Sequence, residues 1–152
     1  MTAIRRAEAA DAEAVGRLLD DFNREFDEET PGADWLAGRV RQLLAAAELT
    51  VLLTGDGPDG LAVLRFRPNL WSDALEAYLA ELYVIPGRRG HGLGRALMEA
   101  AIELARAEGA DYMELGTGED DTAARALYES LGFDNRGGRP NGQVNYFYER
   151  QL

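Results

Sequence analysis

Cysteine and lysine are both absent from this sequence of 152 residues, and histidine occurs once, as His91. The absence of cysteine excludes disulfides, thiolate metal sites and a thiol nucleophile. The absence of lysine excludes mechanisms that depend on a Schiff base, a Walker A phosphate loop or the lysine of a protein kinase. A single histidine without cysteine also argues against a metal site or a catalytic triad at His91. We therefore expect a protein that works without a bound metal.

Long apolar runs and an excess of positive charge are missing too. No stretch of about 18 apolar residues marks a membrane-spanning helix, and the N-terminal residues lack the apolar segment of a signal peptide. The net charge is −11, which argues against general binding to nucleic acids or to anionic membranes. We expect no nucleic-acid or membrane partner and, by default, a cytoplasmic location.

The composition that remains is typical of one globular domain. Hydrophobic residues make up 46% of the chain and charged residues 28%, which are ordinary proportions. A chain of 152 residues has the usual length of a single domain and can bury a core without disulfides. We therefore expect one domain over residues 1–152.

Hydrophobic periodicity predicts an alternation of strands and helices. Asp11 is placed to cap the first helix, and a parallel strand pair is expected on either side of the helix that begins near Leu93. The predicted strands cover residues 3–7, 49–54, 60–68, 76–86, 111–117, 133–135 and 144–151, and the predicted helices cover 11–26, 34–48, 93–108 and 121–132.

The segment RRGHGLGRAL, residues 88–97, combines glycines and arginines between a predicted strand and a predicted helix. The first turn of a helix has unpaired N–H groups and a partial positive charge, and glycine lets a ligand approach the backbone closely. These properties favour an anion site for a phosphate or pyrophosphate. A mobile turn that needs glycine only to bend explains the composition equally well. Neither the dinucleotide fingerprint nor the Walker A pattern fits.

Two motifs in this chain resemble the GNAT family of acyl-CoA-dependent N-acetyltransferases. The first is ELYVIPGRRGHGLGRALMEAAIELA, with R-x-x-G-x-G at Arg89, Gly92 and Gly94, and the second is AARALYESLGF. The resemblance covers the element order of the whole chain, although residues 1–76 match only in pattern. It implies an α/β fold with a mixed, mostly antiparallel sheet of six to seven strands and about four helices. The strands would splay around the site of the cosubstrate, acetyl-CoA.

The resemblance also assigns residues to coenzyme A. The strand before the loop would pair its backbone with the pantetheine arm, at Leu82, Tyr83 and Val84. Asp121 stands where the family commonly has asparagine, but an ionised aspartate only accepts hydrogen bonds and is equally suited to cap a helix. Backbone amides of the loop would bind the pyrophosphate, at Arg89, Gly90, His91, Gly92, Leu93, Gly94 and Arg95.

Two further residues resemble catalytic positions of the family. Glu81 interrupts an apolar run, and members often use a glutamate on this strand as general base towards the substrate ammonium. The structural alternative is a strand carboxylate that pairs with an arginine such as Arg65 or Arg67. Tyr128 resembles the tyrosine that donates a proton to the departing thiolate of coenzyme A. A core tyrosine on the apolar face of its helix is the alternative.

The expected reaction is acetyl transfer to a primary amine by direct attack in a ternary complex, because no cysteine is present to form an acyl-enzyme. The acceptor would be a small-molecule or peptide amine, and acidic residues beside aromatic ones suit a cationic acceptor. A non-catalytic acyl-CoA sensor and an O-acetyltransferase are the rival interpretations, and a homodimer is compatible with the family. The acidic residues are Asp20, Asp21, Glu25, Asp27, Glu28, Glu29 and Asp34, and the aromatic ones are Phe22, Phe26, Trp35 and Trp71.

Overall fold

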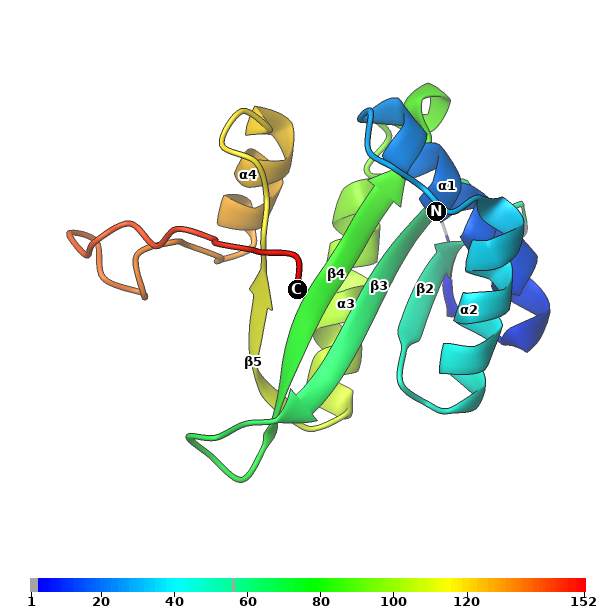
Figure 1. Ribbon diagram of the computed structural model, residues 1–152. Coiled ribbons are helices and arrows are strands. Elements are labelled where there is room, and N and C mark those ends of the chain that lie inside the picture. The colour runs from blue at the N-terminus through cyan, green and yellow to red at the C-terminus, as the bar shows by residue number, and fades with distance from the viewer. Residues whose placement is uncertain (1–2, 56) are drawn as a thin grey trace. The chain divides into compact units, whose positions relative to one another are not determined.

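A computed structural model describes residues 3–55 and 57–152. The chain forms two compact units, Met1–Leu115 and Gly116–Leu152 (Figure 1). No helix in the described part of the chain has the length and apolar character needed to cross a membrane. The elements are, in chain order, β1 (Ile4–Arg6), η1 (Ala9–Asp11), α1 (Ala12–Glu25), α2 (Ala33–Ala45), β2 (Thr50–Thr54), β3 (Gly60–Pro68), β4 (Leu75–Val84), η2 (Pro86–Arg88), α3 (Leu93–Ala107), β5 (Ala110–Leu115) and α4 (Thr122–Ser130).

The first unit is built on a mixed sheet in the order β1-β2-β3-β4-β5. The four strands β1 to β4 pair antiparallel, and β5 pairs parallel to β4. A parallel pair needs a crossover connection, which α3 supplies between β4 and β5. The expected class is therefore confirmed. The expected six to seven strands are not, because the sheet in the described residues has five.

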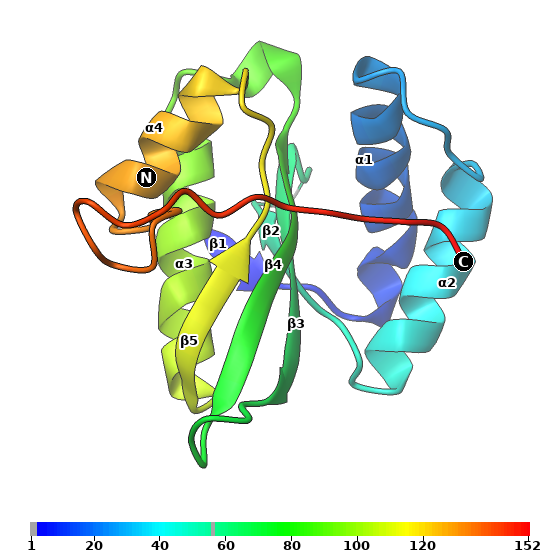
Figure 2. The same ribbon diagram turned by 60° about the vertical axis from the view of Figure 1, so that its left-hand side comes forward.

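Helices cover both faces of this sheet. Figure 2 shows α1 and α2 on one face and α3 on the other. On α1, Val15 and Leu18 are buried in one apolar cluster with sheet residues such as Leu53. On α3, the buried residues follow helical spacing, so one stripe of the helix packs inward; they are Leu93, Leu97, Met98, Ala101 and Ala105.

The helices α1 and α2 pack closely because of a glycine. A Cβ atom added at Gly16 would lie 2.7 Å from Ala33 O and 2.7 Å from Ala37 N, both backbone atoms of α2. No side chain can relieve such an overlap, so the backbones themselves would have to move apart. Gly16 thereby sets the position of α2 above the sheet, which matters for the pocket described below.

Asp11 has a different partner from the one expected. Its carboxylate does not cap α1 with a side-chain hydrogen bond. It accepts two hydrogen bonds from the guanidinium of Arg5, at 2.9 and 2.8 Å, and one from the Glu8 N–H at 2.8 Å. These bonds, the one from Arg5 first, lower the pKa of Asp11 from 3.8 to about 2. Asp11 therefore joins β1 to the start of the helical layer.

Replacing Asp11 with asparagine should destabilise the fold by about 1–2 kcal/mol at neutral pH, since an ion pair with a part-exposed arginine contributes modestly. The pKa of Asp11 is lower in the folded state, so its contribution is present above 3.8 and is lost as the pH falls towards about 2. Urea unfolding at pH 7 and at about pH 2 checks this. Exposed Glu99, replaced by glutamine, is the control. A difference of equal size at both pH values would contradict the assignment.

The second unit holds α4 and an extended C-terminal segment. The strands expected at 133–135 and 144–151 are not formed in residues 116–152. The Asn145 N–H donates to Asn135 O at 2.7 Å, but one such bond does not make a ladder. Between them, Gly137 and Gly138 adopt positive φ angles of 67° and 75°. The apolar alternation of this segment therefore has no paired strand to support it.

Candidate active site

The glycine loop exposes backbone at the start of α3. Gly90 and Gly92 both have a φ of 80°, a left-handed conformation that side chains with a Cβ rarely adopt. Gly92 is the N-cap, and the first turn of α3 contains no acidic residue. The N–H groups of Leu93 and Gly94 lie in this first turn, where a helix offers them no acceptor. The loop thus combines bare backbone with the positive end of a helix dipole.

The arginine side chains beside the loop are engaged with the protein. Arg89 lies 2.7 Å from Glu25 Oε2, donates to Glu25 Oε1 at 2.8 Å and donates to Val84 O at 2.9 Å. Arg88 lies 2.8 Å from a carboxylate oxygen of Asp59. Both guanidinium groups therefore brace the loop against neighbouring elements. This leaves mainly the backbone of the loop to meet an anion.

Glu25 at the end of α1 is the centre of this bracing. The hydrogen bond from Arg89 is the largest cause that lowers the pKa of Glu25. The hydroxyl of Tyr83 also donates to Glu25, at 3.0 Å, and burial is the main cause that raises the pKa of Tyr83 to about 12. The Tyr83 ring stacks on Phe22 with centroids 4.8 Å apart. The end of β4, the loop and α1 are thereby tied together.

His91 also contributes to the shape of the loop. Its Nδ1 lies 3.0 Å from Arg89 O and 3.3 Å from Arg88 O. Carbonyl oxygens only accept, so Nδ1 carries the proton and donates. The exposed ring of His91 is thus anchored to the turn through Nδ1.

Strand β4 continues beyond the end of β5 before it reaches the loop. Their ladder runs from the pair Leu75 and Ala110 to the pair Leu79 and Leu115. Beyond Leu79, in the described part of this unit, β4 pairs only with β3, for example Leu82 with Ala62. One edge of the segment Leu82–Val84 is therefore open, and an open strand edge can pair with the backbone-like groups of a ligand.

A β-bulge places Glu81 on the face of the sheet covered by α1 and α2. Val63 pairs with Glu81 but the next residue, Leu64, pairs with Leu79, so Ala80 is extra on β4. A bulge lets two successive residues face the same side, and both Ala80 and Glu81 line one pocket. Burial raises the pKa of Glu81 above 4.5, and the Arg65 guanidinium lowers it in part.

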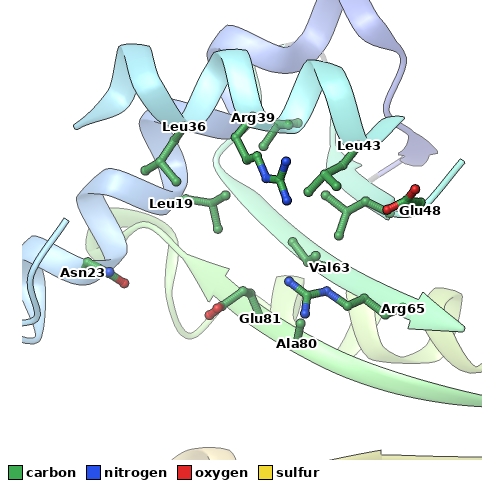
Figure 3. A pocket seen from close by; sticks show the side chains of 12 residues that line it. Leu19, Asn23, Leu36, Arg39, Leu43, Glu48, Val63, Arg65, Ala80 and Glu81 are labelled. Carbon is green, nitrogen blue, oxygen red and sulfur yellow. The ribbon is translucent and has the colours of Figure 1, made fainter. Parts of the chain in front are cut away.

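The Glu81 pocket lies between α1, α2 and the sheet and has a volume of about 430 Å³ (Figure 3). This volume lies within the range of small-molecule sites. Figure 3 shows the Glu81 carboxylate and the guanidinium groups of Arg39 and Arg65 around the same space. The lining residues are Leu19, Asn23, Leu36, Arg39, Val40, Leu43, Glu48, Leu49, Val63, Arg65, Ala80 and Glu81.

Tyr128 and Asp121 belong to the second unit. Tyr128 on α4 is 8% exposed, and burial, followed by the charge of Asp121, raises its pKa to about 12. Its ring contacts Phe133 edge-to-face with centroids 6.3 Å apart. Asp121 is the N-cap of α4 and accepts a hydrogen bond from the Ala124 N–H at 3.2 Å. The capping role considered for Asp121 is therefore real, and Tyr128 keeps its proton at neutral pH.

Comparison with known proteins connects these features. Residues 12–133 match the model of the acetyltransferase (GNAT) family. The match includes α1, the glycine loop and α4. The chain belongs to the GNAT acetyltransferase family. A crystal structure described as that of an acetyltransferase from Arthrobacter sp. FB24 is 48% identical to this chain with a TM-score of 0.91, and the match covers 100% of this chain and 97% of that one.

Curated relatives of this GNAT protein differ in length. A mycothiol acetyltransferase from Thermobispora bispora is 34% identical over 84% of this chain, which spans only 39% of that protein. One from Beutenbergia cavernae is 43% identical over 43% of this chain, which spans 23% of it. An uncharacterized N-acetyltransferase from Bacillus subtilis, YhfO, is 27% identical over 86% of this chain and 89% of its own length.

The seven acidic residues expected near a cationic acceptor lie outside the Glu81 pocket. Asp20 is buried and accepts from Arg24 at 2.8 Å and from Thr30 at 2.7 Å, while Glu25 is bound to Arg89. The remaining five are exposed side chains: Asp21, Asp27, Glu28, Glu29 and Asp34.

Two arginines, Arg65 and Arg39, line the pocket beside Glu81. Arg67 forms ion pairs with Glu76 and with Glu114, the latter at 2.9 Å, so it is not the partner of Glu81. Arg65 affects the pKa of Glu81 through its charge. Arg39 was missed, although its spacing of three from Leu36 and four to Leu43 places it on the same stripe of α2.

Proposed function

We propose that this GNAT protein transfers the acetyl group of acetyl-CoA to the primary amine of a small molecule, by direct attack in a ternary complex. The observation that carries the proposal is the placement of Glu81. Its carboxylate lines a pocket from a bulged strand that continues into the glycine loop. A proton acceptor and the backbone assigned to the cosubstrate thus lie on one continuous segment.

The loop and strand supply the cosubstrate site in this proposal. The open edge of β4, at Leu82, Tyr83 and Val84, pairs with the pantetheine arm. Asp121 stays a candidate contact of the same arm through its free oxygen. The backbone of the loop binds the pyrophosphate, at Arg89, Gly90, His91, Gly92, Leu93, Gly94 and Arg95.

The proposed chemistry needs one base and one donor. Glu81 takes a proton from the acceptor's ammonium group, and the neutral nitrogen attacks the carbonyl carbon of the thioester. The C–N bond forms, the C–S bond breaks and the thiolate of coenzyme A leaves. The nitrogen loses its second proton to water as the amide forms. The Tyr128 hydroxyl donates a hydrogen bond to the departing sulfur, and the thiolate then takes a proton from water. The products are an amide, the thiol of coenzyme A and one proton.

This reaction requires both units of the chain, so we propose that they act as one acetyltransferase domain. Glu81 and the loop belong to Met1–Leu115, and Tyr128 belongs to Gly116–Leu152. The family match over residues 12–133 crosses the boundary between them, which supports the proposal.

The test is calorimetric titration with acetyl-CoA and coenzyme A, followed by panels of amines and alcohols monitored for thiol release. We expect micromolar binding and release that depends on an amine. Gly92→Asp is the control: a Cβ at a φ of 80° strains the loop and a carboxylate repels phosphate, so binding should weaken by at least about tenfold.

Each other outcome has a clear meaning. Binding without turnover of any acceptor would favour an acyl-CoA sensor, and release that depends only on alcohols would favour an O-acetyltransferase. If the wild-type protein does not bind acetyl-CoA, or Gly92→Asp binds it as tightly, the loop has a different purpose.

A further inference from the structure

Two arginines face the space beside Glu81. Arg39 projects from α2 and Arg65 from β3, and Figure 3 shows both guanidinium groups directed into the pocket from opposite walls. Neither forms an ion pair with any residue that the structure describes. By contrast, Arg88 and Arg89 beside the loop are both held by carboxylates. Two carboxylates, Glu81 and Glu48, line the same pocket, but neither is ion-paired with these arginines among the described residues.

Most of the other residues that line the pocket are apolar. Leu36 and Leu43 of α2 flank Arg39, and Leu19 and Val63 line the walls beneath it. Arg39 and Arg65 are both exposed residues, so they would hold a ligand mainly through direct charged hydrogen bonds. In Figure 3 the Glu81 carboxylate points towards the Asn23 side, and the two guanidinium groups lie on its other side. The two guanidinium groups thus lie between the Glu81 carboxylate on one side and the Glu48 carboxylate on the other.

We propose that the acceptor is a small zwitterion, an amino carboxylate, whose carboxylate is bound between Arg39 and Arg65 while its amine faces Glu81. This inference rests on the proposed function and names its substrate class. A guanidinium group presents a planar fork of donors that matches a carboxylate, and such pairs are often bidentate. Two forks from opposite walls can hold one carboxylate by both oxygens.

The charges also fix the direction in which such an acceptor enters. Its ammonium is repelled by the two arginines and attracted to Glu81, and its carboxylate has the reverse preferences. A simple amine would gain only the Glu81 contact and would have to lie beside two cations. A carboxylate on the acceptor gives the two guanidinium groups a hydrogen-bonding partner that Glu81 and Glu48, although they line the same pocket, do not supply through an ion pair. The volume of about 430 Å³ suits an amino acid with room for a side chain.

The test compares matched pairs of acceptors. The twenty L-amino acids, 4-aminobutyrate and their carboxamides are assayed with acetyl-CoA, together with O-phosphoethanolamine and ethanolamine. We expect at least one amino carboxylate to exceed its own carboxamide by about tenfold or more in kcat/KM, since a charged hydrogen-bonded pair is lost in the amide. Arg39→Gln should reduce this ratio of acid to amide about tenfold, mainly through the KM of the acid.

The control is Arg41→Gln, which removes an exposed arginine of the same helix that does not line the pocket. The ratio of acid to amide should stay as in the wild type. The inference is overturned if carboxamides are acetylated as well as the acids, if Arg39→Gln leaves the ratio unchanged, or if O-phosphoethanolamine is preferred to every carboxylate. Each of those results would leave the proposed function, acetyl transfer to an amine, intact. If acetyl-CoA binds and no amine of any kind is acetylated, the proposed function itself fails.

Discussion

Glu81→Gln is expected to lower kcat by about 10²–10⁴-fold, the usual contribution of a positioned general base. Glutamine keeps the shape of the side chain but cannot take up the ammonium proton. The side chain sits at a bulge in a pocket, so no neighbouring residue of the same strand can replace it. Steady-state rates at saturating acetyl-CoA and acceptor measure the effect. Glu76→Gln, on the same strand but ion-paired with Arg67, should keep turnover near that of the wild type.

The pH profile separates a base from a structural carboxylate. Burial raises the pKa of Glu81 above 4.5, so wild-type kcat/KM should fall as the pH drops through this raised pKa. The Gln variant should lack that acidic limb. An unchanged limb in the variant would mean that another group takes the proton.

Stability should move in the opposite direction to activity. A carboxyl group with a raised pKa in the folded state binds its proton more tightly there than in the unfolded chain. Its contribution is therefore most favourable below the ordinary pKa of 4.5 and declines as the pH rises through the raised one. Glu81→Gln should be at least as stable as the wild type at pH 7, in urea unfolding. An inactive but unfolded variant would say nothing of catalysis, and this measurement identifies that case.

Tyr128→Phe is expected to lower kcat by about 10²-fold while the affinity for acetyl-CoA stays nearly unchanged. Its pKa of about 12 means that the hydroxyl stays protonated at neutral pH. A phenol with this pKa does not readily give its proton to a thiolate with a pKa near ~8.5. The hydroxyl should act mainly as a hydrogen-bond donor to the developing negative charge on sulfur, for which losses of about 10²-fold are typical.

Two measurements check the role of Tyr128. Single-turnover rates report the chemical step, and calorimetry reports the binding of acetyl-CoA. Tyr148→Phe makes the same change at an exposed position of the same unit and should alter neither. If Tyr128→Phe transfers the acetyl group at the wild-type rate with both substrates saturating, Tyr128 is a core residue only.

Local signals explain what the sequence predicted well. The glycine loop and the start of α3 at Leu93 depend on neighbouring residues, so the turn and the 3.6-residue period are visible in the chain itself. The bracing of the loop is not local. Arg89 and Glu25 are 64 residues apart, and the local sequence around either residue does not predict that they pair. The sequence therefore suggested a cationic loop, whereas the structure places its arginines in ion pairs.

The bulge in β4 and the absence of the expected C-terminal strands in residues 116–152 were likewise not predictable from the local sequence. The run EAYLAELYV contains no glycine or proline that would indicate an extra residue at Ala80. The segment VNYFYERQ has the composition of a strand, yet Tyr146 and Tyr148 are exposed in an unpaired segment. A strand exists only with a partner, and pairing is a property of the fold rather than of the segment.

The bulge at Ala80 changes which residues of β4 face α1 and α2. Every residue after it is one step out of phase with those before it, so Glu81 and Tyr83 share a side with Ala80 rather than with Leu79. Deleting Ala80 would remove the extra residue and leave an ordinary alternation, in which Leu79 still pairs with Leu64, Glu81 still pairs with Val63, and each keeps its face of the sheet. Deleting Leu82, which lies beyond the bulge, would instead turn Tyr83 away from α1 and towards α3. A change of length in β4 should therefore be tolerated at the bulge and be costly after it.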